Sequence, residues 1–318
     1  MKTAVVLAAG GIVGQAFHLG VLGCLQDLTG FDAREADVLV GSSAGSLVAA
    51  GLAGGLSVSD LRAEMLGEPL SPEGQQVRGA RRAVPTMPAA EAVPSGRGPL
   101  AAGALLHAAR RPWSVRPGAL ASSLLPPGQV GTDLIARSLQ RLHGAQWPDR
   151  DLRIAAVRAR DAQRVVFGAP GAPEVDVGTA VAASCAIPSY FAPVVVDGEA
   201  YVDGGAHSPS NADVVLADRP DLVVVSSPMT VGRGGLRRPR ADLAVRLAIR
   251  TYLAQEVRQL RRAGAHVVVL QPSPEDLPVM GFNPMRGIVA EDVIDTAAAS
   301  TRARLQARPD LADRLSRA

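Results

Sequence analysis

The chain has 318 residues, of which 47% are hydrophobic, 20% charged and 3% aromatic, and its formal net charge is +3. This apolar fraction excludes a disordered, charge-rich tail, and the length suffices for a large aliphatic core. So few aromatic rings argue against a nucleic-acid platform based on base stacking, and two cysteines cannot form the disulfide framework of a small secreted scaffold.

Residues 3–8 predict a buried parallel strand, followed by a glycine turn and a helix. Apolar residues recur on one face of this helix: Val13, Phe17, Val21, Cys24 and Leu28. A charged start before an apolar run is also typical of a signal peptide, but glycines break this run and His18 lies where such a peptide needs hydrocarbon. Because no stretch offers the ~18 apolar residues of a membrane span, we expect a cytoplasmic protein.

A second apolar strand, 36–40, leads directly into Gly41-Ser42-Ser43-Ala44-Gly45, and a helix of small residues is expected over 44–53. The pentapeptide fits G-x-S-x-G, the nucleophile elbow, whose serine lies on a sharp turn between strand and helix. Its two glycines lack Cβ atoms and let the neighbouring backbone approach. Ser43 would then lie above a helix N-terminus, whose dipole favours a developing anion. A plain glycine-serine turn is the alternative.

The segment 67–128 differs in composition, with ten of the 24 prolines and seven Arg against three Glu. A long, proline-broken insertion in a compact domain is usually a functional lid or a disordered surface segment, and both remain open here. Two short apolar helices are expected within it, over 100–109 and 119–125. Trp113, between Arg111 and Arg116, would suit contact with an anionic membrane surface.

The remaining chain continues the alternation of strands and helices. Helices are expected over 132–142, 176–186, 240–263 and from 290 onward, and strands over 152–160, 164–168, 194–196, 200–202, 222–226 and 266–270. This order predicts an α/β fold with a central, mostly parallel sheet. Asp197-Gly198 predicts a tight hairpin turn.

The helix over 240–263 is basic and amphipathic. Its apolar face consists of Val245, Ile249, Leu253, Val257 and Leu260, and arginines populate its other faces. Such a helix can lie on an anionic membrane, but more often it covers a sheet with its charges in water, which we favour here.

A serine nucleophile needs a base, and no motif fixes any of the five histidines in that role. His207 is the nearest candidate, because it lies four residues after Asp203. Asp203-Gly204-Gly205 is a more specific candidate, since it presents a carboxylate at the end of a strand followed by two flexible residues. A simple turn is the alternative for this tripeptide.

Acyl transfer also needs hydrogen-bond donors for the oxyanion. The turn over residues 9–14 opens the first helix and would present free backbone N–H groups at Gly10 and Gly11. Dinucleotide binding competes for such a turn, but the spacing is not G-x-G-x-x-G and the next strand ends in the serine elbow. An oxyanion loop is therefore the better interpretation.

These motifs, in this order, resemble the patatin-like phospholipase family. The segments that carry the resemblance are Gly10-Gly11-Ile12-Val13-Gly14, Gly41-Ser42-Ser43-Ala44-Gly45, Ala183-Ser184-Cys185-Ala186-Ile187-Pro188 with Phe191-Ala192-Pro193-Val194, and Asp203-Gly204-Gly205. The resemblance implies a three-layer α/β/α fold and a Ser–Asp dyad without histidine. It makes Ser43 the nucleophile, Asp203 the base, and the amides of Gly10, Gly11 and Ala44 the oxyanion hole. The chain departs from the family pattern at Ala9, where a third glycine is usual, and at Val13, where an arginine is usual.

We therefore expect a single patatin-like domain over 1–318, with the insertion at 67–128 and a C-terminal helical extension over 286–318. The expected activity is hydrolysis of lipid ester bonds through an acyl-enzyme. A small-ester hydrolase or acyltransferase without a membrane role, and a catalytically silent module that binds lipid or a partner, are the alternatives. No metal, no cofactor and no nucleic acid is expected.

Overall fold

The computed structural model describes residues 1–80, 102–110, 115–232 and 242–318. Its strands are β1 (Thr3–Leu7), β2 (Val38–Ser42), β3 (Asp151–Arg158), β4 (Gln163–Phe167), β5 (Val194–Val196), β6 (Glu199–Asp203), β7 (Leu222–Ser226) and β8 (His266–Leu270). Within these described residues the strands form one eight-stranded sheet in the order β5-β6-β3-β2-β1-β7-β8, and β4 pairs with β3 off this path. The run from β3 to β8 is parallel, whereas β4, β5 and β6 pair antiparallel, as expected for a mostly parallel sheet.

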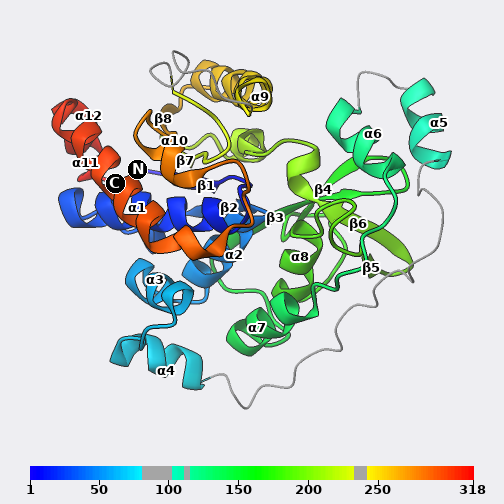
Figure 1. Cartoon of the computed structure of the whole chain (residues 1–318), viewed down its shortest axis with the longest axis horizontal. Coiled ribbons are helices and arrows are strands. Elements are labelled where there is room, and N and C mark those ends of the chain that lie inside the picture. The colour runs from blue at the N-terminus through cyan, green and yellow to red at the C-terminus, as the bar shows by residue number, and fades with distance from the viewer. Residues whose placement is uncertain (81–101, 111–114, 233–241) are drawn as a thin grey trace.

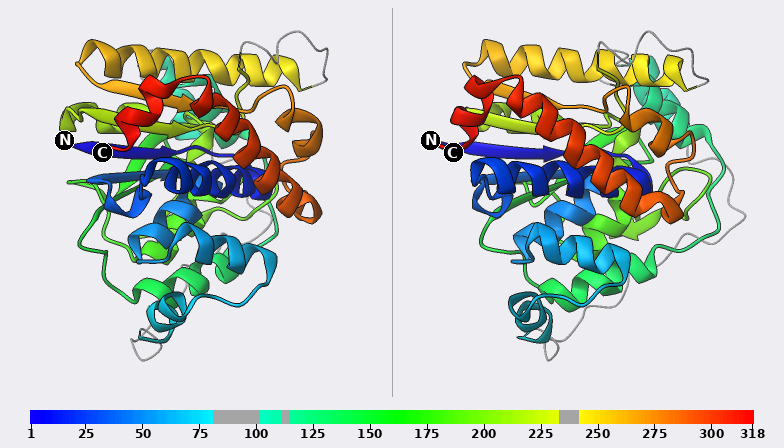
Figure 2. Two further views of the ribbon diagram at one scale, coloured as in Figure 1. Left: turned by 90° about the vertical axis from the view of Figure 1, so that its left-hand side faces the viewer. Right: turned by 60° about the vertical axis from the view of Figure 1, so that its left-hand side comes forward.

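Helices cover both faces of the sheet. They are α1 (Gly11–Thr29), α2 (Ala44–Ala53), α3 (Val58–Leu66), α4 (Pro72–Ala80), α5 (Ala102–Arg110), α6 (Pro117–Leu124), α7 (Asp133–His143), α8 (Val177–Ser184), α9 (Leu243–Arg262), α10 (Asp276–Met280), α11 (Ala290–Gln306) and α12 (Pro309–Leu315), with the 3-10 segment η4 (Ala212–Asp218). Figure 1 shows α9 on one side of the sheet and α1, α2 and α8 on the other, and Figure 2 shows the same layers from two further sides. The expected three-layer α/β/α arrangement is confirmed.

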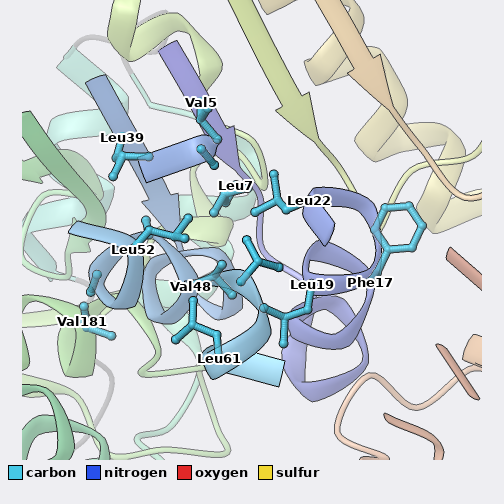
Figure 3. Close-up of a cluster of buried hydrophobic side chains, with 14 of the residues drawn as sticks. Val5, Leu7, Phe17, Leu19, Leu22, Leu39, Val48, Leu52, Leu61 and Val181 are labelled. Carbon is cyan, nitrogen blue, oxygen red and sulfur yellow. The ribbon is translucent and has the colours of Figure 1, made fainter. Parts of the chain in front are cut away.

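The two cores follow from the alternation of side chains along the strands. Val5 and Leu7 of β1 pack with α1, α2, α8 and α11, whereas Ala4 and Val6 pack with α9 and η4 on the opposite face. Figure 3 shows aliphatic side chains of β1 and β2 meeting those of α1, α2 and α3. Both faces of the central strands are buried, so these strands are apolar runs without polar alternation.

The described part of the insertion packs against the sheet. Helices α5 and α6 lie close to the predicted positions, and they form a small apolar cluster with the strands that includes Ala104, Ala119, Val157 and Val202. Val202 directly precedes Asp203, so this part of the insertion contacts the strand that carries the predicted base. Trp113 and Arg111 lie outside the described residues.

Two predicted apolar faces are shorter than expected. Leu28 at the end of α1 and Val245 near the start of α9 are exposed, whereas Leu253, Val257 and Leu260 of α9 are buried against the sheet. A helix of 20 residues spans about 30 Å and a five-residue strand about 17 Å, so the first turns of α9 extend beyond the sheet. The covering role predicted for α9 is confirmed for its C-terminal half.

The C-terminal helix belongs to the layer built around α1. A Cβ atom at Gly20 of α1 would overlap the carbonyl group of Ile294 in α11, and Ala297 packs at the same place. The close approach of the two helices depends on this glycine, so residues after 290 pack against the first helix of the chain.

Candidate active site

The predicted elbow forms at the junction of β2 and α2. The strand ends at Ser42, two residues later than expected, and Ser43 has φ 51° and ψ −123°, a backbone conformation that non-glycine residues rarely adopt. A Cβ atom at Gly41 would overlap Ser46, and one at Gly45 would overlap the carbonyl group of Leu7. The two glycines therefore permit the close packing that holds Ser43 in its strained turn.

Two further serines hold the elbow in place. The backbone N–H of Ser43 donates to Oγ of Ser184 at 2.9 Å, and that hydroxyl donates to the carbonyl oxygen of Ala155 at 2.7 Å. Oγ of Ser46 donates to the carbonyl oxygen of Ser43 at 2.6 Å. Neither Ser184 nor Ser46 was predicted as a site residue, although Ser184 lies in one of the motif segments.

The strand register brings Asp203 to the elbow. Ser42 pairs with Ala155 of β3, and Asp203 of β6 pairs with the next residue, Ala156. β4 occupies the opposite edge of β3 over these residues, so β2 and β6 share one edge and meet there at their carboxyl ends. Ser43 therefore lies beside the Asp203 carboxylate, close enough to lower the pKa of that carboxyl group.

The Asp203 carboxylate is buried, and its surroundings change its acidity. Burial raises its pKa to about 6, and hydrogen bonds from Ser43 and from the Gly205 N–H, the latter at 2.7 Å, oppose this shift. A Cβ atom at Gly204 would overlap the Ala155 carbonyl group. The absence of a side chain at Gly204 therefore allows the chain to pass close to β3 directly after Asp203. A carboxylate with a pKa of about 6 is ionised at neutral pH and is a stronger base than an ordinary aspartate.

Two of the five histidines, His18 and His143, have hydrogen-bond partners other than Ser43 and Asp203. The ring nitrogens of His18 lie 2.7 Å from Oγ of Ser226 and from the carbonyl oxygen of Ala8, which ties the ends of β1 and β7 together. His143 bonds the carbonyl oxygen of Ala50 at 2.8 Å. Burial and the nearby charges of Arg164 and Arg116 lower the pKa of His207 to about 3.

The glycine turn after β1 leaves backbone donors at the start of α1. Gly11 has φ 62°, and its neighbour Val13 donates its N–H to the carbonyl oxygen of Pro284 at 2.9 Å. The first helical bond runs from the Gly14 N–H to the Gly10 carbonyl group. The N–H groups of Gly10 and Gly11 precede that bond, where a helix has no acceptors of its own.

An apolar pocket of about 290 Å³ opens beside Ser43. Gly11, Ser43 and Ala44 line it together with apolar side chains: Ile12, Leu47, Ile135, Cys185, Ile187, Phe191 and Met285. Gly10 lines a neighbouring cavity of about 180 Å³ with Val13, Pro228 and Arg246. The structure thus brings Ser43, Ala44 and Gly11 into one pocket, with Gly10 at the adjoining one.

Two observations concern metals and membranes. Over residues 1–80, 102–110, 115–232 and 242–318, no group of three or more His, Cys, Asp or Glu side chains is arranged to hold a metal ion. In the same ranges no helix has the length and apolar character needed to cross a bilayer.

Comparison with known proteins gives one family. A family model described as patatin-like phospholipase matches residues 5–216, more than half of the chain. Among solved structures, the chain is similar to VipD from Legionella pneumophila, with 13% identity and a TM-score of 0.45, over 96% of this chain and 67% of that chain. It is also similar to the type III effector protein ExoU, with 19% identity and a TM-score of 0.38, over 96% of this chain and 53% of that chain. No curated protein matches the sequence.

Proposed function

Because this chain belongs to the patatin-like phospholipase family and is thus a hydrolase of ester bonds, we propose that it cleaves carboxylic esters of lipids with Ser43 and Asp203 as a catalytic dyad. The observation that carries the proposal is the strand register, which brings the buried Asp203 carboxylate to the Ser43 elbow. Neither histidine nor metal is required for the steps that follow.

In the first half of the reaction, Asp203 accepts the proton of the Ser43 hydroxyl as Oγ attacks the ester carbonyl carbon. The tetrahedral intermediate collapses, the C–O bond to the alcohol breaks, and Asp203 returns the proton to the leaving oxygen. In the second half, Asp203 takes a proton from water, the hydroxide attacks the acyl-enzyme, and Ser43 regains its proton as the fatty acid leaves.

The oxyanion hole consists of the backbone amides of Gly10, Gly11 and Ala44 in this proposal. Gly11 and Ala44 line the pocket that contains Ser43, which supports their share of the role. The Gly10 amide precedes the first helical bond of α1, where it has no intrahelical acceptor. Each lost donor of this kind typically costs about 10²- to 10³-fold in rate.

The pocket beside Ser43 is proposed to hold the acyl chain. Its apolar lining favours hydrocarbon, and burial of each methylene contributes about 0.8 kcal/mol. Ser43 lines this pocket, and the ester carbonyl group of a bound chain is proposed to lie beside its hydroxyl group.

A serine-directed fluorophosphonate tests the dyad. We expect stoichiometric labelling of Ser43, located by mass spectrometry, and loss of labelling and of p-nitrophenyl ester hydrolysis in Ser43→Ala. Asp203→Asn should lower kcat at least 10³-fold. His207→Asn should remain within about threefold of the wild type, because the proposed base is Asp203 and not His207. Folded wild-type protein that resists the label would support the catalytically silent alternative instead.

Contact with a lipid surface is the second part of the proposal. Leu134, Tyr190 and Ile288 are 82%, 50% and 89% exposed, although each lies within three residues of a side chain that lines the Ser43 pocket. Exposed apolar side chains around a pocket mouth are typical of a membrane-facing site. We propose that these three side chains lie around the pocket mouth and contact the membrane surface, so that a lipid can enter the pocket directly.

Vesicle sedimentation tests this surface. Leu134→Ser with Ile288→Ser should reduce binding to phosphatidylglycerol vesicles at least tenfold and leave hydrolysis of a soluble ester within threefold. Leu28→Ser, at the far end of α1, is the matched control and should bind as the wild type does. Equal vesicle binding by all variants would place the lipid contact on another surface, and no binding by the wild type would favour the small-ester hydrolase.

A further inference from the structure

The segment that follows Asp203, residues 204–212 and here called the aspartate loop, contacts every part of the candidate site. Its first residue, Gly204, directly follows Asp203. The carbonyl oxygen of Pro209 accepts the N–H of Ala9 at 2.8 Å, next to the glycine turn. Nδ2 of Asn211 donates to Oγ of Ser42 at 2.8 Å, next to Ser43. The loop therefore fixes the base, the oxyanion turn and the elbow relative to one another.

One carboxylate from a distant helix holds this loop. Glu256 of α9 is fully buried and accepts hydrogen bonds from Oγ of Ser208 and Oγ of Ser210, both at 2.6 Å, and from the N–H of Ala212 at 3.0 Å. The guanidinium group of Arg116 lies 3.6 Å from this carboxylate and 5.0 Å from the ring centre of Tyr252. The three donors lie in one short stretch of chain, so a single acceptor group fixes the whole loop.

We infer that Glu256 is a positioning residue for the reaction, holding the aspartate loop so that Asp203, the glycine turn and the serine elbow keep their relative positions. The inference rests on the proposed dyad for its catalytic consequence. Glu256 itself touches none of the three reacting groups, and it acts through the hydrogen bonds of Ser208, Ser210 and Ala212.

The chemistry of the three donors explains why a carboxylate is needed. The Ala212 N–H can only donate, and both serine hydroxyls already donate to Glu256, so an apolar replacement leaves buried donors without an acceptor. The loop would shift to recover hydrogen bonds. A shift of about 1 Å at a distance from the chemistry can cost on the order of 10²-fold in rate.

Asp60 provides a matched control elsewhere in the fold. It is buried and accepts the same set of donors, namely Oγ of Ser57 at 2.6 Å, Oγ of Ser71 at 3.1 Å and the N–H of Ser71 at 2.8 Å. It lies on α3 and lines no pocket with Ser43. Asp60→Ala therefore reports the effect of losing a buried acceptor without any effect on the aspartate loop.

Steady-state hydrolysis of a soluble ester tests the inference, with folding verified by circular dichroism. Glu256→Ala should lower kcat about 100-fold with KM within threefold, and Glu256→Gln, which retains one acceptor oxygen, should recover to within tenfold of the wild type. Asp60→Ala should stay within threefold in both parameters.

An equal loss in Glu256→Ala and Asp60→Ala, or no loss in Glu256→Ala, would overturn the inference. Ser210→Ala, which removes one bond, replaces Glu256→Ala where the latter does not fold, with about a tenfold loss expected.

Amide hydrogen exchange supplies a readout that does not depend on activity. Glu256→Ala should raise exchange at least tenfold in residues 204–212 and in residues 8–11, whereas Asp60→Ala should raise it in residues 57–75 alone. Unchanged exchange of the aspartate loop in Glu256→Ala refutes the positioning role even if the dyad is correct. Raised exchange in a chain whose Ser43→Ala variant remains fully active supports the positioning role and rejects the dyad.

Discussion

Ser43 and Asp203 meet because the strands that precede them end against the same edge of β3, where Ser42 pairs with Ala155 and Asp203 pairs with Ala156. The two strands approach from opposite directions, so neither needs a long loop to deliver its side chain. The relative positions of Ser43 and Asp203, the proposed dyad, are thus fixed by backbone hydrogen bonds of the sheet. Its geometry should persist in the free enzyme.

The raised pKa of Asp203 predicts the pH dependence of the reaction. Asp203, as the proposed base, must be ionised, so kcat/KM for a soluble ester should rise with pH, reach half its plateau near pH 6, and fall about tenfold per unit below pH 5. A pH–rate profile between pH 4 and 8 checks this. A midpoint near pH 4 would show that burial does not perturb the carboxylate in solution.

The same pKa predicts that Asp203 lowers stability at neutral pH. Its pKa is about 6 in the folded chain against 3.8 for the unperturbed group, so its favourable contribution is complete below pH 3.8 and is lost as pH rises through 6. Asp203→Asn does not titrate and should be more stable than the wild type at pH 8, by about 3 kcal/mol.

Urea denaturation at several pH values measures this difference. The stability gained by Asp203→Asn should shrink toward zero well below pH 3.8, because the Asp203 carboxyl group is then neutral in both the folded and the unfolded chain. Asp213→Asn is a useful contrast, since Arg164 pairs with Asp213 and holds its pKa below the ordinary value despite burial. That variant should lose stability at pH 8, and a gain there would contradict the electrostatic explanation.

The elbow could be predicted because its signal is local. A strand, the G-x-S-x-G pentapeptide and a helix follow one another in Val38–Ala53, and the structure has them in that order. The hairpin turn at Asp197-Gly198 was equally local, and both residues have positive φ. Helix and strand positions of this kind depend on short-range sterics and on apolar periodicity, which a single sequence contains.

Glu256 could not be predicted, because its role depends on which segment packs against its helix. It lies beside Val257 on the buried side of α9, where periodicity gives no reason for a carboxylate. Ser184 was similarly hidden, since its acceptor belongs to β3 and its donor to the elbow. Gly10 and Gly11 line two different cavities, and this difference also arises from tertiary packing. Pro228 lines the cavity at Gly10, and Met285 lines the pocket at Gly11.

The backbone strain at Ser43 predicts a difference in stability between Ser43→Gly and Ser43→Ala, both of which we expect to be inactive. Glycine adopts φ 51° and ψ −123° without a Cβ penalty, whereas alanine retains it. Ser43→Gly should therefore be more stable than Ser43→Ala by about 1 kcal/mol in thermal or urea denaturation. Equal stability, or a more stable alanine variant, would show that the elbow is relaxed in solution.

The pocket lining predicts how acyl-chain preference can be changed. Ile135 of α7 lines the Ser43 pocket, so Ile135→Phe should reduce its volume and shift the preference for p-nitrophenyl esters toward shorter chains, with at least a tenfold fall in the C12 to C4 ratio of kcat/KM. Arg137→Phe adds the same ring on the exposed part of α7 and should leave this ratio within twofold. Equal ratios in the two variants would place the acyl chain outside this pocket. A parallel fall for C4 and C12 in Ile135→Phe would instead indicate that the larger ring disturbs the elbow, because Leu47 of α2, the helix that follows Ser43, lines the same pocket.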